Sequence, residues 1–426
     1  MEKLPDWRGT SLILAERLRR QLSYYSGIGR DATLIVLASS VASFYWGVYS
    51  VIPGVFFPQV GFTDIQVGSL YSVNGVTSAL LGIPLSILSD RHGRRKGMLI
   101  GIAMVGSSFF VYAVTINYVH LLIASFVSGL GFGLFFPNSN ALLAERTTES
   151  KRTVAFSLSF FVSTAAGTMG TLFSVIPALL RAIGVGLIPS YQAVYALTGI
   201  IFLSGLIPAL FVKESTLSDK GLSLPRRSAG FIARFSLVNI MVGLGAGLII
   251  PIFSLWFYIK FRYDETVLAP LNTVATLATA LAGLLAPRIA DWLGDVPSIL
   301  LENGLGTLIM LVMPTTSSFA VLGMLFVVRQ FLANMSSPII SSFYMTHVDP
   351  DERAAASAIS GTAWNFPNSI TPAVGGYLME NVSVDLPLYM CGTSYALGVL
   401  LIYRFFFKYR KKTKTTRKIL QMSKEV

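Results

Sequence analysis

Arg329 could do the most distinctive chemistry in this sequence, because it is the only basic residue deep inside a long apolar stretch. A charge in hydrocarbon is expensive, so such an Arg normally faces a helix-bundle interior or a water-filled cavity. Two interpretations stay open. Arg329 could bind an anionic solute or control a gate, with Asn365 or Asn368 nearby. It could instead bond to backbone carbonyls and hold helices together.

Side chains in two other apolar stretches could line a solute pathway. Residues 355–379 contain Trp364, Asn365 and Asn368 at helical spacing, together with two prolines. Prolines free backbone carbonyls, which membrane depth tolerates only where protein or cavity water satisfies them. We therefore expect 355–379 to line the pathway. Residues 32–57 carry the aromatics Tyr45, Trp46 and Tyr49 on one side, which either line a pocket or pack between helices.

Acidic and metal-binding side chains are missing from the middle of every apolar stretch. Glu302 comes nearest, and we expect its side chain to reach the cytoplasmic interface. His92, His120 and His347 fall at the ends of stretches, and Cys391 is the single cysteine. Because proton-coupled transporters commonly use an intramembrane carboxylate or His, simple carboxylate-based proton coupling is not supported. We expect no catalytic cluster, no metal and no cofactor.

The composition identifies the class of protein that must position these residues. Of the 426 residues, 53% are hydrophobic and only 13% are charged, about half the ~25% of soluble domains. A soluble protein could not cover its surface with so few charges, which indicates a polytopic membrane protein. The net charge of +12 then reflects loops that face anionic lipid, not nucleic-acid binding.

Twelve stretches are long enough to cross the membrane as helices, because each has the ~20 residues that a ~30 Å hydrocarbon core requires. They are 32–57, 65–88, 97–116, 120–143, 153–180, 191–212, 231–259, 266–289, 297–315, 319–345, 355–379 and 386–407. The predicted fold class is an all-α membrane protein with twelve transmembrane helices.

The basic residues predict the orientation of the chain. With the N-terminus in the cytoplasm, only Arg181, Lys260 and Arg262 of the 33 Lys and Arg lie outside, while Arg329 lies within a span. This asymmetry is a strong positive-inside signal that places both termini in the cytoplasm. Residues 1–30 form either an amphipathic surface helix or a loose tail. Residues 408–426 form a basic tail that faces lipid headgroups.

Landmark residues recur at one offset of 201 residues, which indicates a duplicated, parallel six-helix unit. The pairs are Gly82 and Gly283, Asp90 and Asp291, Gly93 and Gly294, Pro137 and Pro338, and Arg152 and Arg353. The chain thus divides into a first bundle (31–212), a cytoplasmic linker (213–230) and a second bundle (231–407).

The loop between the second and third stretches carries the most specific motif of the sequence. Its residues are Gly82, Asp90, Arg91, Gly93, Arg94 and Arg95, and a weaker copy holds Gly283, Asp291 and Gly294. This pattern resembles the signature of the major facilitator superfamily, whose fold consists of two six-helix bundles. Gly93 can adopt the positive φ that so short a loop requires.

The resemblance implies that these residues act as a gate. In the family, the loop cluster latches the two halves on the cytoplasmic side, and its acidic and basic partners here are Glu145 and Arg152. Asp291 and Gly294 belong to the degenerate copy of the motif. Signatures that many drug antiporters carry in their fourth and fifth spans are incomplete here.

We therefore expect a secondary active transporter that moves a small organic solute across the cell membrane by alternating access. Arg329 favours an anionic metabolite, whereas the apolar, aromatic lining favours efflux of lipophilic or drug-like compounds. A membrane sensor would need an additional soluble module, and a membrane enzyme would need a polar cluster at membrane depth. The expected partners are the solute and the lipid bilayer, and we expect a multi-pass monomer.

Overall fold

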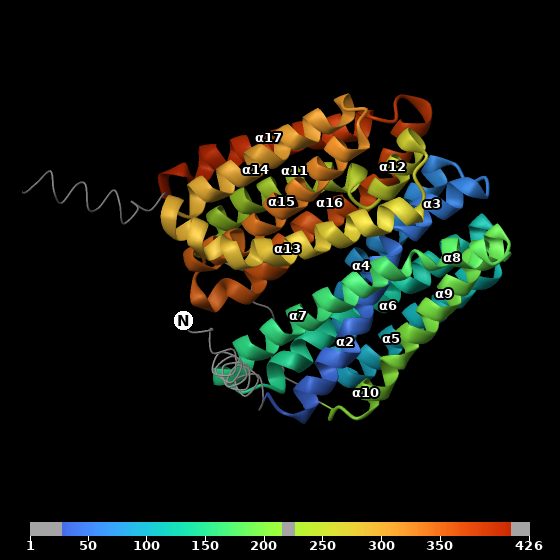
Figure 1. The fold of residues 1–426 in the computed structure, drawn as a ribbon. Helices are drawn as coiled ribbons and strands as arrows, with labels where there is room; N and C mark the ends of the chain where they lie inside the picture. Colours follow the sequence, from blue (N-terminus) through green and yellow to red (C-terminus); the bar gives the residue numbers. More distant parts are fainter. Residues whose placement is uncertain (1–27, 215–225, 410–426) are drawn as a thin grey trace, which may run out of the picture.

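The computed structural model describes residues 28–214 and 226–409, and Figure 1 shows the arrangement of their helices. The predicted amphipathic N-terminal segment, most of the linker and most of the basic tail lie outside these ranges. The described part is helical, with no strand in either range. This confirms the predicted all-α class.

Six spans form the first half of the molecule, and three of them are broken into two helices. They are α2 (Arg30–Tyr49) with α3 (Ile52–Gln59), α4 (Asp64–His92), α5 (Arg94–Val114), α6 (Tyr118–Glu145), α7 (Glu149–Phe173) with α8 (Ile176–Ala182), and α9 (Leu187–Ser204) with α10 (Leu206–Leu210).

Six further spans form the second half in the same order. They are α11 (Ala229–Ile249) with α12 (Phe253–Phe261), α13 (Glu265–Leu293), α14 (Asp295–Val312) with η1 (Met313–Thr315), α15 (Phe319–His347), then η2 (Pro350–Glu352), α16 (Arg353–Asn381), and α17 (Leu386–Phe406) with η3 (Phe407–Tyr409).

Eleven helical segments of the described ranges are long and apolar enough to cross a membrane. The remaining span, the eleventh in chain order, is α16, which is 29 residues long but more polar than the others. The twelve predicted stretches all correspond to helices, and the boundaries differ by a few residues because charged helix ends extend beyond the apolar segments.

The two halves begin and end their helices at equivalent residues. Thr63 caps α4 with a side chain that accepts from the backbone N–H of Gln66, and Asp264 caps α13 with a side chain that accepts from the backbone N–H of Thr266. Such caps satisfy backbone N–H groups that the first helical turn leaves free. At the other end, Gly93 and Gly294 have φ values of 115° and 90°, which L side chains rarely adopt.

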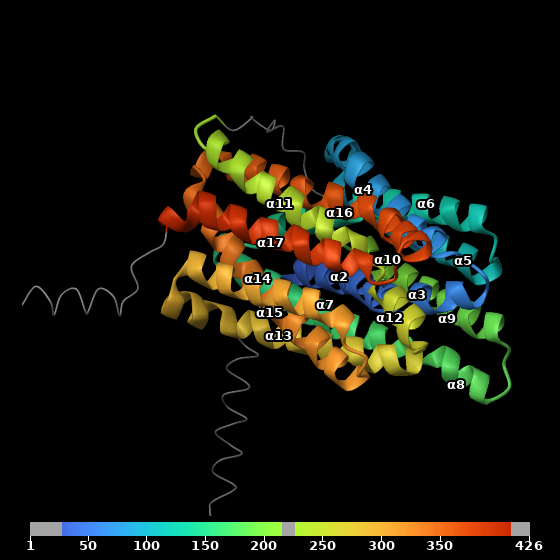
Figure 2. The ribbon, with the colours of Figure 1, turned by 90° about the horizontal axis from the view of Figure 1, so that it is seen from above.

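The two bundles lie close together on one side of the molecule and diverge on the other (Figure 1). We call the side where α2 and α11 begin and α17 ends the terminal face, and the opposite side, where α3, α8 and α12 lie, the far face. Seen from above, α4 and α16 run side by side across the boundary between the halves (Figure 2), and they are among the most extensively packed helix pairs.

Candidate functional site

A cavity of about 820 Å³ lies between the two halves, within the range of small-molecule binding sites. Its lining on α4 extends from Tyr71 to Ser86, and on α6 from Phe132 to Asn140. Both helices contribute their middle and their terminal-face half, so the cavity extends from the middle of the molecule toward the terminal face.

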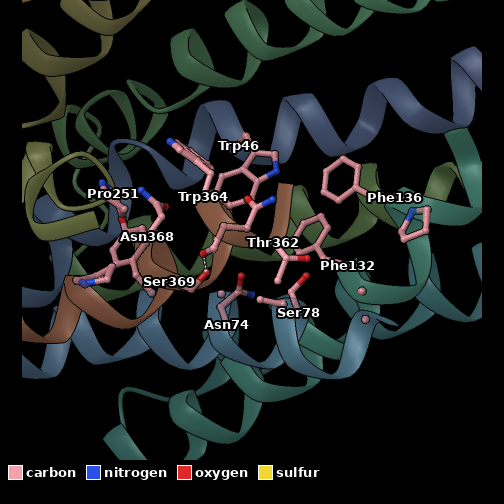
Figure 3. A pocket seen from close by; sticks show the side chains of 18 of the residues that line it. Trp46, Asn74, Ser78, Phe132, Phe136, Pro251, Thr362, Trp364, Asn368 and Ser369 are labelled. Carbon is pink, nitrogen blue, oxygen red and sulfur yellow. Dashed lines mark hydrogen bonds between the residues drawn. The ribbon is translucent and has the colours of Figure 1, made fainter. Parts of the chain in front are cut away.

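The first half contributes an aromatic wall, defined here as Trp46, Tyr49, Tyr71, Phe132 and Phe136. Figure 3 shows Trp46, Phe132 and Phe136 of this wall. The rings of Trp46 and Phe132 stack with centroids 5.7 Å apart, and Phe132 stacks on Phe136 at 5.4 Å. Tyr49 packs on Tyr71 at 4.6 Å. Such ring pairs contribute about 0.5–1.5 kcal/mol each beyond burial, so the contacts within the wall hold its rings in place.

The second half contributes polar groups of α16 to the same cavity, among them Thr362, Asn368 and Ser369 (Figure 3). Asn365 is exposed to the cavity and Asn368 partly so. Neither side-chain amide is hydrogen-bonded to a residue in the described ranges, so both can bind a solute. Trp364, 38% exposed, adds an indole ring beside them.

Two prolines interrupt the backbone hydrogen bonding of α16 beside the cavity. Pro367 and Pro372 cannot donate to the helix. Ser72 on α4 bonds to the backbone of this stretch across the boundary: its hydroxyl donates to Ile370 O at 3.1 Å and accepts from the backbone N–H of Ala373 at 2.9 Å. The backbone of α16 beside Pro372 is therefore hydrogen-bonded to the other half.

Lys, Arg, Asp and Glu are all missing from the residues that line the cavity. Arg329 is buried elsewhere in the second half, where it donates to Gln330 Oε1 at 2.6 Å and to the Tyr395 hydroxyl at 3.3 Å. Tyr45 is buried behind the aromatic wall, 4.9 Å from the Phe132 ring. Of the seven predicted binding residues, the structure thus brings together Trp46, Tyr49, Trp364, Asn365 and Asn368, but neither Tyr45 nor Arg329.

A polar contact that sequence reasoning missed joins the halves at the far face. Arg181 of α8 donates to Glu265 Oε1 at 2.6 Å, and the Tyr191 hydroxyl of α9 donates to Glu265 Oε2 at 2.6 Å. Glu265 is fully buried. In the sequence, Glu265 follows the cap residue Asp264 and looks like an acidic residue of an ordinary helix start. It becomes a buried partner of Arg181 and Tyr191 only because the first half packs against it.

The backbones of the two halves also pack closely at the far face. Gly68 and Gly376 have no room for a Cβ, because the first lies against Pro372 O and the second against Asp64 O. Ser254 donates to Ser50 O at 2.5 Å. The far face is therefore closed by direct half-to-half contact.

On the terminal face, the predicted gating residues cluster within the first half. Arg94 forms ion pairs with Asp90 and Glu145. The backbone N–H of Arg95 donates to Glu214 Oε1 at 2.8 Å, and its guanidinium donates to Leu210 O. This cluster stiffens the loop after α4 and makes no ion pair to described residues of the second half.

The remaining predicted gating residues take other positions. Gly82 packs against Gly133, where a Cβ would come within 3.1 Å of backbone. Arg91, Arg152 and Asp291 are exposed and form no ion pair with residues in the described ranges. Gly294 matches Gly93 in conformation.

Glu352 anchors the chain on the terminal face of the second half. Its carboxylate accepts from the backbone N–H groups of Arg226, Arg227 and Ser228 at 2.5–2.8 Å. Desolvation raises the pKa of Glu352, but these donors outweigh it and lower the pKa to about 2. The start of α11 is thereby fixed to the loop before α16.

The position of the Glu302 side chain differs from the position expected from the sequence. Its side chain does not reach the terminal face, since the residue is 1% exposed and both carboxylate oxygens lack a hydrogen-bond partner in the described part of the chain. The expectation was wrong because α15 and α17 pack over this face of α14.

Comparisons with known proteins agree with this arrangement. The sequence model of the family described as Major Facilitator Superfamily matches residues 34–365 and 235–421. Multidrug resistance protein 1 of Bacillus subtilis (strain 168) is 21% identical over 87% of this chain and 96% of its own. A probable 4-methylmuconolactone transporter of Cupriavidus pinatubonensis is 33% identical over 36% of this chain and 33% of its own. The crystal structure of nucleoside transporter NupG superposes with a TM-score of 0.68 at 13% identity, covering 90% of this chain and 100% of that one.

Proposed function

The chain belongs to the major facilitator superfamily, and we propose that it is a secondary active transporter that carries a small organic solute by alternating access. The observation that carries this proposal is the cavity between the halves. It is closed at the far face by half-to-half contacts and extends toward the terminal face, as a carrier that has opened to one side requires.

The cavity lining favours an uncharged or lipophilic aromatic solute. A ring can stack on the aromatic wall, while the amides of Asn365 and Asn368 bind its polar groups. The anionic interpretation depended on Arg329, whose guanidinium already binds Gln330 and Tyr395 away from the cavity. Between the two sequence-based alternatives, the lining therefore favours lipophilic or drug-like compounds. The likeness to Multidrug resistance protein 1 agrees with this choice.

A ligand screen by thermal stability tests this proposal on the purified full-length protein in detergent. Neutral aromatic compounds should raise the unfolding temperature of the wild type and of Arg329→Gln alike. Trp46→Ala should weaken the apparent affinity about 2- to 12-fold, as expected for the loss of one ring contact of about 0.5–1.5 kcal/mol.

Two results would contradict the choice of solute. Stabilisation by organic anions that disappears in Arg329→Gln would make Arg329 the solute anchor. Unchanged affinity in both Trp46→Ala and Asn368→Ala would remove the cavity as the binding site.

We also propose the membrane orientation and the gate. The positive-inside asymmetry supports a cell-membrane protein with the terminal face in the cytoplasm, acting as a monomer. The cluster of Asp90, Arg94 and Glu145 would then contact the second half when the cytoplasmic side closes. Unchanged transport rate and unchanged cytoplasmic accessibility in Asp90→Asn would refute this gating role.

A further inference from the structure

The inner end of the cavity, farthest from the terminal face, lies where α4 comes against α16. These two helices line it with Tyr71, Asn74, Gly75, Asn368, Ser369 and Pro372. A Cβ on Gly75 would lie 2.7 Å from the Ser369 hydroxyl oxygen, so the two halves leave no space between them here. Figure 3 shows Asn74 on α4 and Ser369 on α16. A solute at the inner end therefore contacts both halves at once.

The carboxamide of Asn74 makes one hydrogen bond to the described residues, and this bond fixes its orientation. Nδ2 donates to Ser125 O of α6 at 3.5 Å. Only the nitrogen can face this carbonyl, because two oxygens would both be acceptors. Oδ1 therefore points away from Ser125. Oδ1 is not among the fully buried polar atoms that lack a partner. Since Asn74 is 5% exposed and lines the cavity, Oδ1 is an acceptor that a solute can reach.

Backbone packing holds Asn74 in this position. A Cβ on Gly129 of α6 would lie 2.4 Å from Asn74 O, so α4 and α6 touch at this level. On α16, the Ser369 hydroxyl donates to Asn365 O at 2.7 Å. Its hydrogen is thereby used within the helix, and its oxygen can only accept from a solute. Each half thus supplies one acceptor oxygen to the inner end of the cavity.

We infer that Asn74 is a specificity-determining residue, whose Oδ1 accepts a hydrogen bond from an N–H or O–H group on the edge of an uncharged aromatic solute. This inference rests on the proposed function, because it names the class of solute that the same cavity takes. A solute without such a donor displaces water from Oδ1 and leaves a buried acceptor unpaired. A site that bonds a polar group of its solute rejects the analogue that lacks this group. The aromatic wall binds the ring, and Asn74 selects its substituent.

Probe pairs that differ in this donor test the inference on the purified full-length protein in detergent. Indole has a ring N–H that 1-methylindole lacks, and 2-naphthol has an O–H that 2-methoxynaphthalene lacks. Isothermal titration calorimetry measures each affinity, corrected for partition of the probe into micelles. In each pair, the donor compound should bind the wild type about 10-fold more tightly. This ratio corresponds to about 1.4 kcal/mol, within the cost of one unpaired buried acceptor.

Two substitutions remove the acceptor. In Asn74→Leu and in Asn74→Ala, the affinity ratio within each pair should fall to about 1, because no oxygen is left to accept the donor. Asn303→Ala is the matched control. Asn303 donates to Ile299 O of its own helix at 2.8 Å and does not line the cavity, so this variant should keep the wild-type ratio. Each ratio compares two probes on one variant, and a general loss of stability therefore cancels.

Three results would overturn the inference: equal affinities within both pairs in the wild type, a wild-type ratio that persists in both Asn74 variants, or no binding of any of the four probes to the wild type. The proposed function is decided separately by the thermal-stability screen. If aromatic solutes stabilise the protein but show no preference for a donor, the proposed function stands and the role of Asn74 falls. If no solute in the screen stabilises the wild type, the proposed function falls.

Discussion

The far face and the terminal face are held by different kinds of contact. At the far face, the ion pair between Arg181 and Glu265 crosses from one half to the other, and Gly68 brings two backbones together. At the terminal face, the ion pairs of Arg94 and Arg227 each join residues of a single half. Among the described residues, ion pairs between the two halves therefore occur only at the far face, where backbones of the two halves also pack closely.

Removal of the far-face charge should have the largest effect on this asymmetry. Glu265→Gln deprives Arg181 of its buried anionic partner, which costs about 3 kcal/mol, the low end for such pairs. Arg181 stays 24% exposed, which is why the low end applies. The far face should open, and pulsed electron paramagnetic resonance between spin labels at Ile183 and Arg262 should show longer distances.

A matched control removes a charge from the same face but within one half. Asp385 pairs with Lys260, and both belong to the second half. Asp385→Asn should leave the distance distribution between these labels unchanged. If both variants opened the far face equally, the distinction between ion pairs that join the two halves and ion pairs within one half would be wrong.

Close backbone packing should contribute the next largest effect. Gly68→Ala forces α4 away from α16, because its Cβ would collide with Pro372 O, and overpacking of this kind costs about 1–3 kcal/mol. The closed conformation should be depopulated and the unfolding temperature lowered. Gly283→Ala is the control, because a Cβ there meets nothing within 4 Å. A control variant as unstable as Gly68→Ala would refute the packing argument.

Removal of a terminal-face charge should have a smaller effect in this conformation. Asp90→Asn breaks a pair whose acidic partner is 45% exposed, and such pairs contribute about 0–1 kcal/mol. We expect no change in the label distances across the far face. Opening of the far face in this variant would show that the two faces are coupled through the first half.

The smallest effect should come from the pH dependence of the Glu352 anchor. Its folded pKa of about 2 lies below the ordinary value of 4.5, so its stabilisation is complete above pH 4.5 and is lost as the pH falls toward 2. Glu352→Gln should therefore differ from the wild type in unfolding temperature at neutral pH and converge with it in acid. Curves that stayed parallel down to pH 2 would contradict this assignment.

The membrane-spanning helices were predictable from the sequence because their causes are local. Apolar length defines each span, cap residues such as Thr63 and Asp264 define helix starts, and Gly93 and Gly294 define tight reversals. The cavity lining was partly predictable. The amides of α16 and the ring of Trp46 were expected there, because polar and aromatic groups inside an apolar helix suggest a pathway.

The sequence by itself determined the number of spans, the duplication and the charge asymmetry. Each of these can be read from the order of residues along the chain, because bilayer thickness sets the length of an apolar span and the basic residues lie in the loops between spans. Only the tertiary structure decided which side chains of each helix face the cavity, a neighbouring helix or the outside of the molecule. Helix packing buried Glu302 and Glu265, kept Arg329 on Tyr395 and moved Tyr45 behind the aromatic wall. Those positions depend on contacts between helices far apart in sequence, and one residue along a helix rotates a side chain by about 100°.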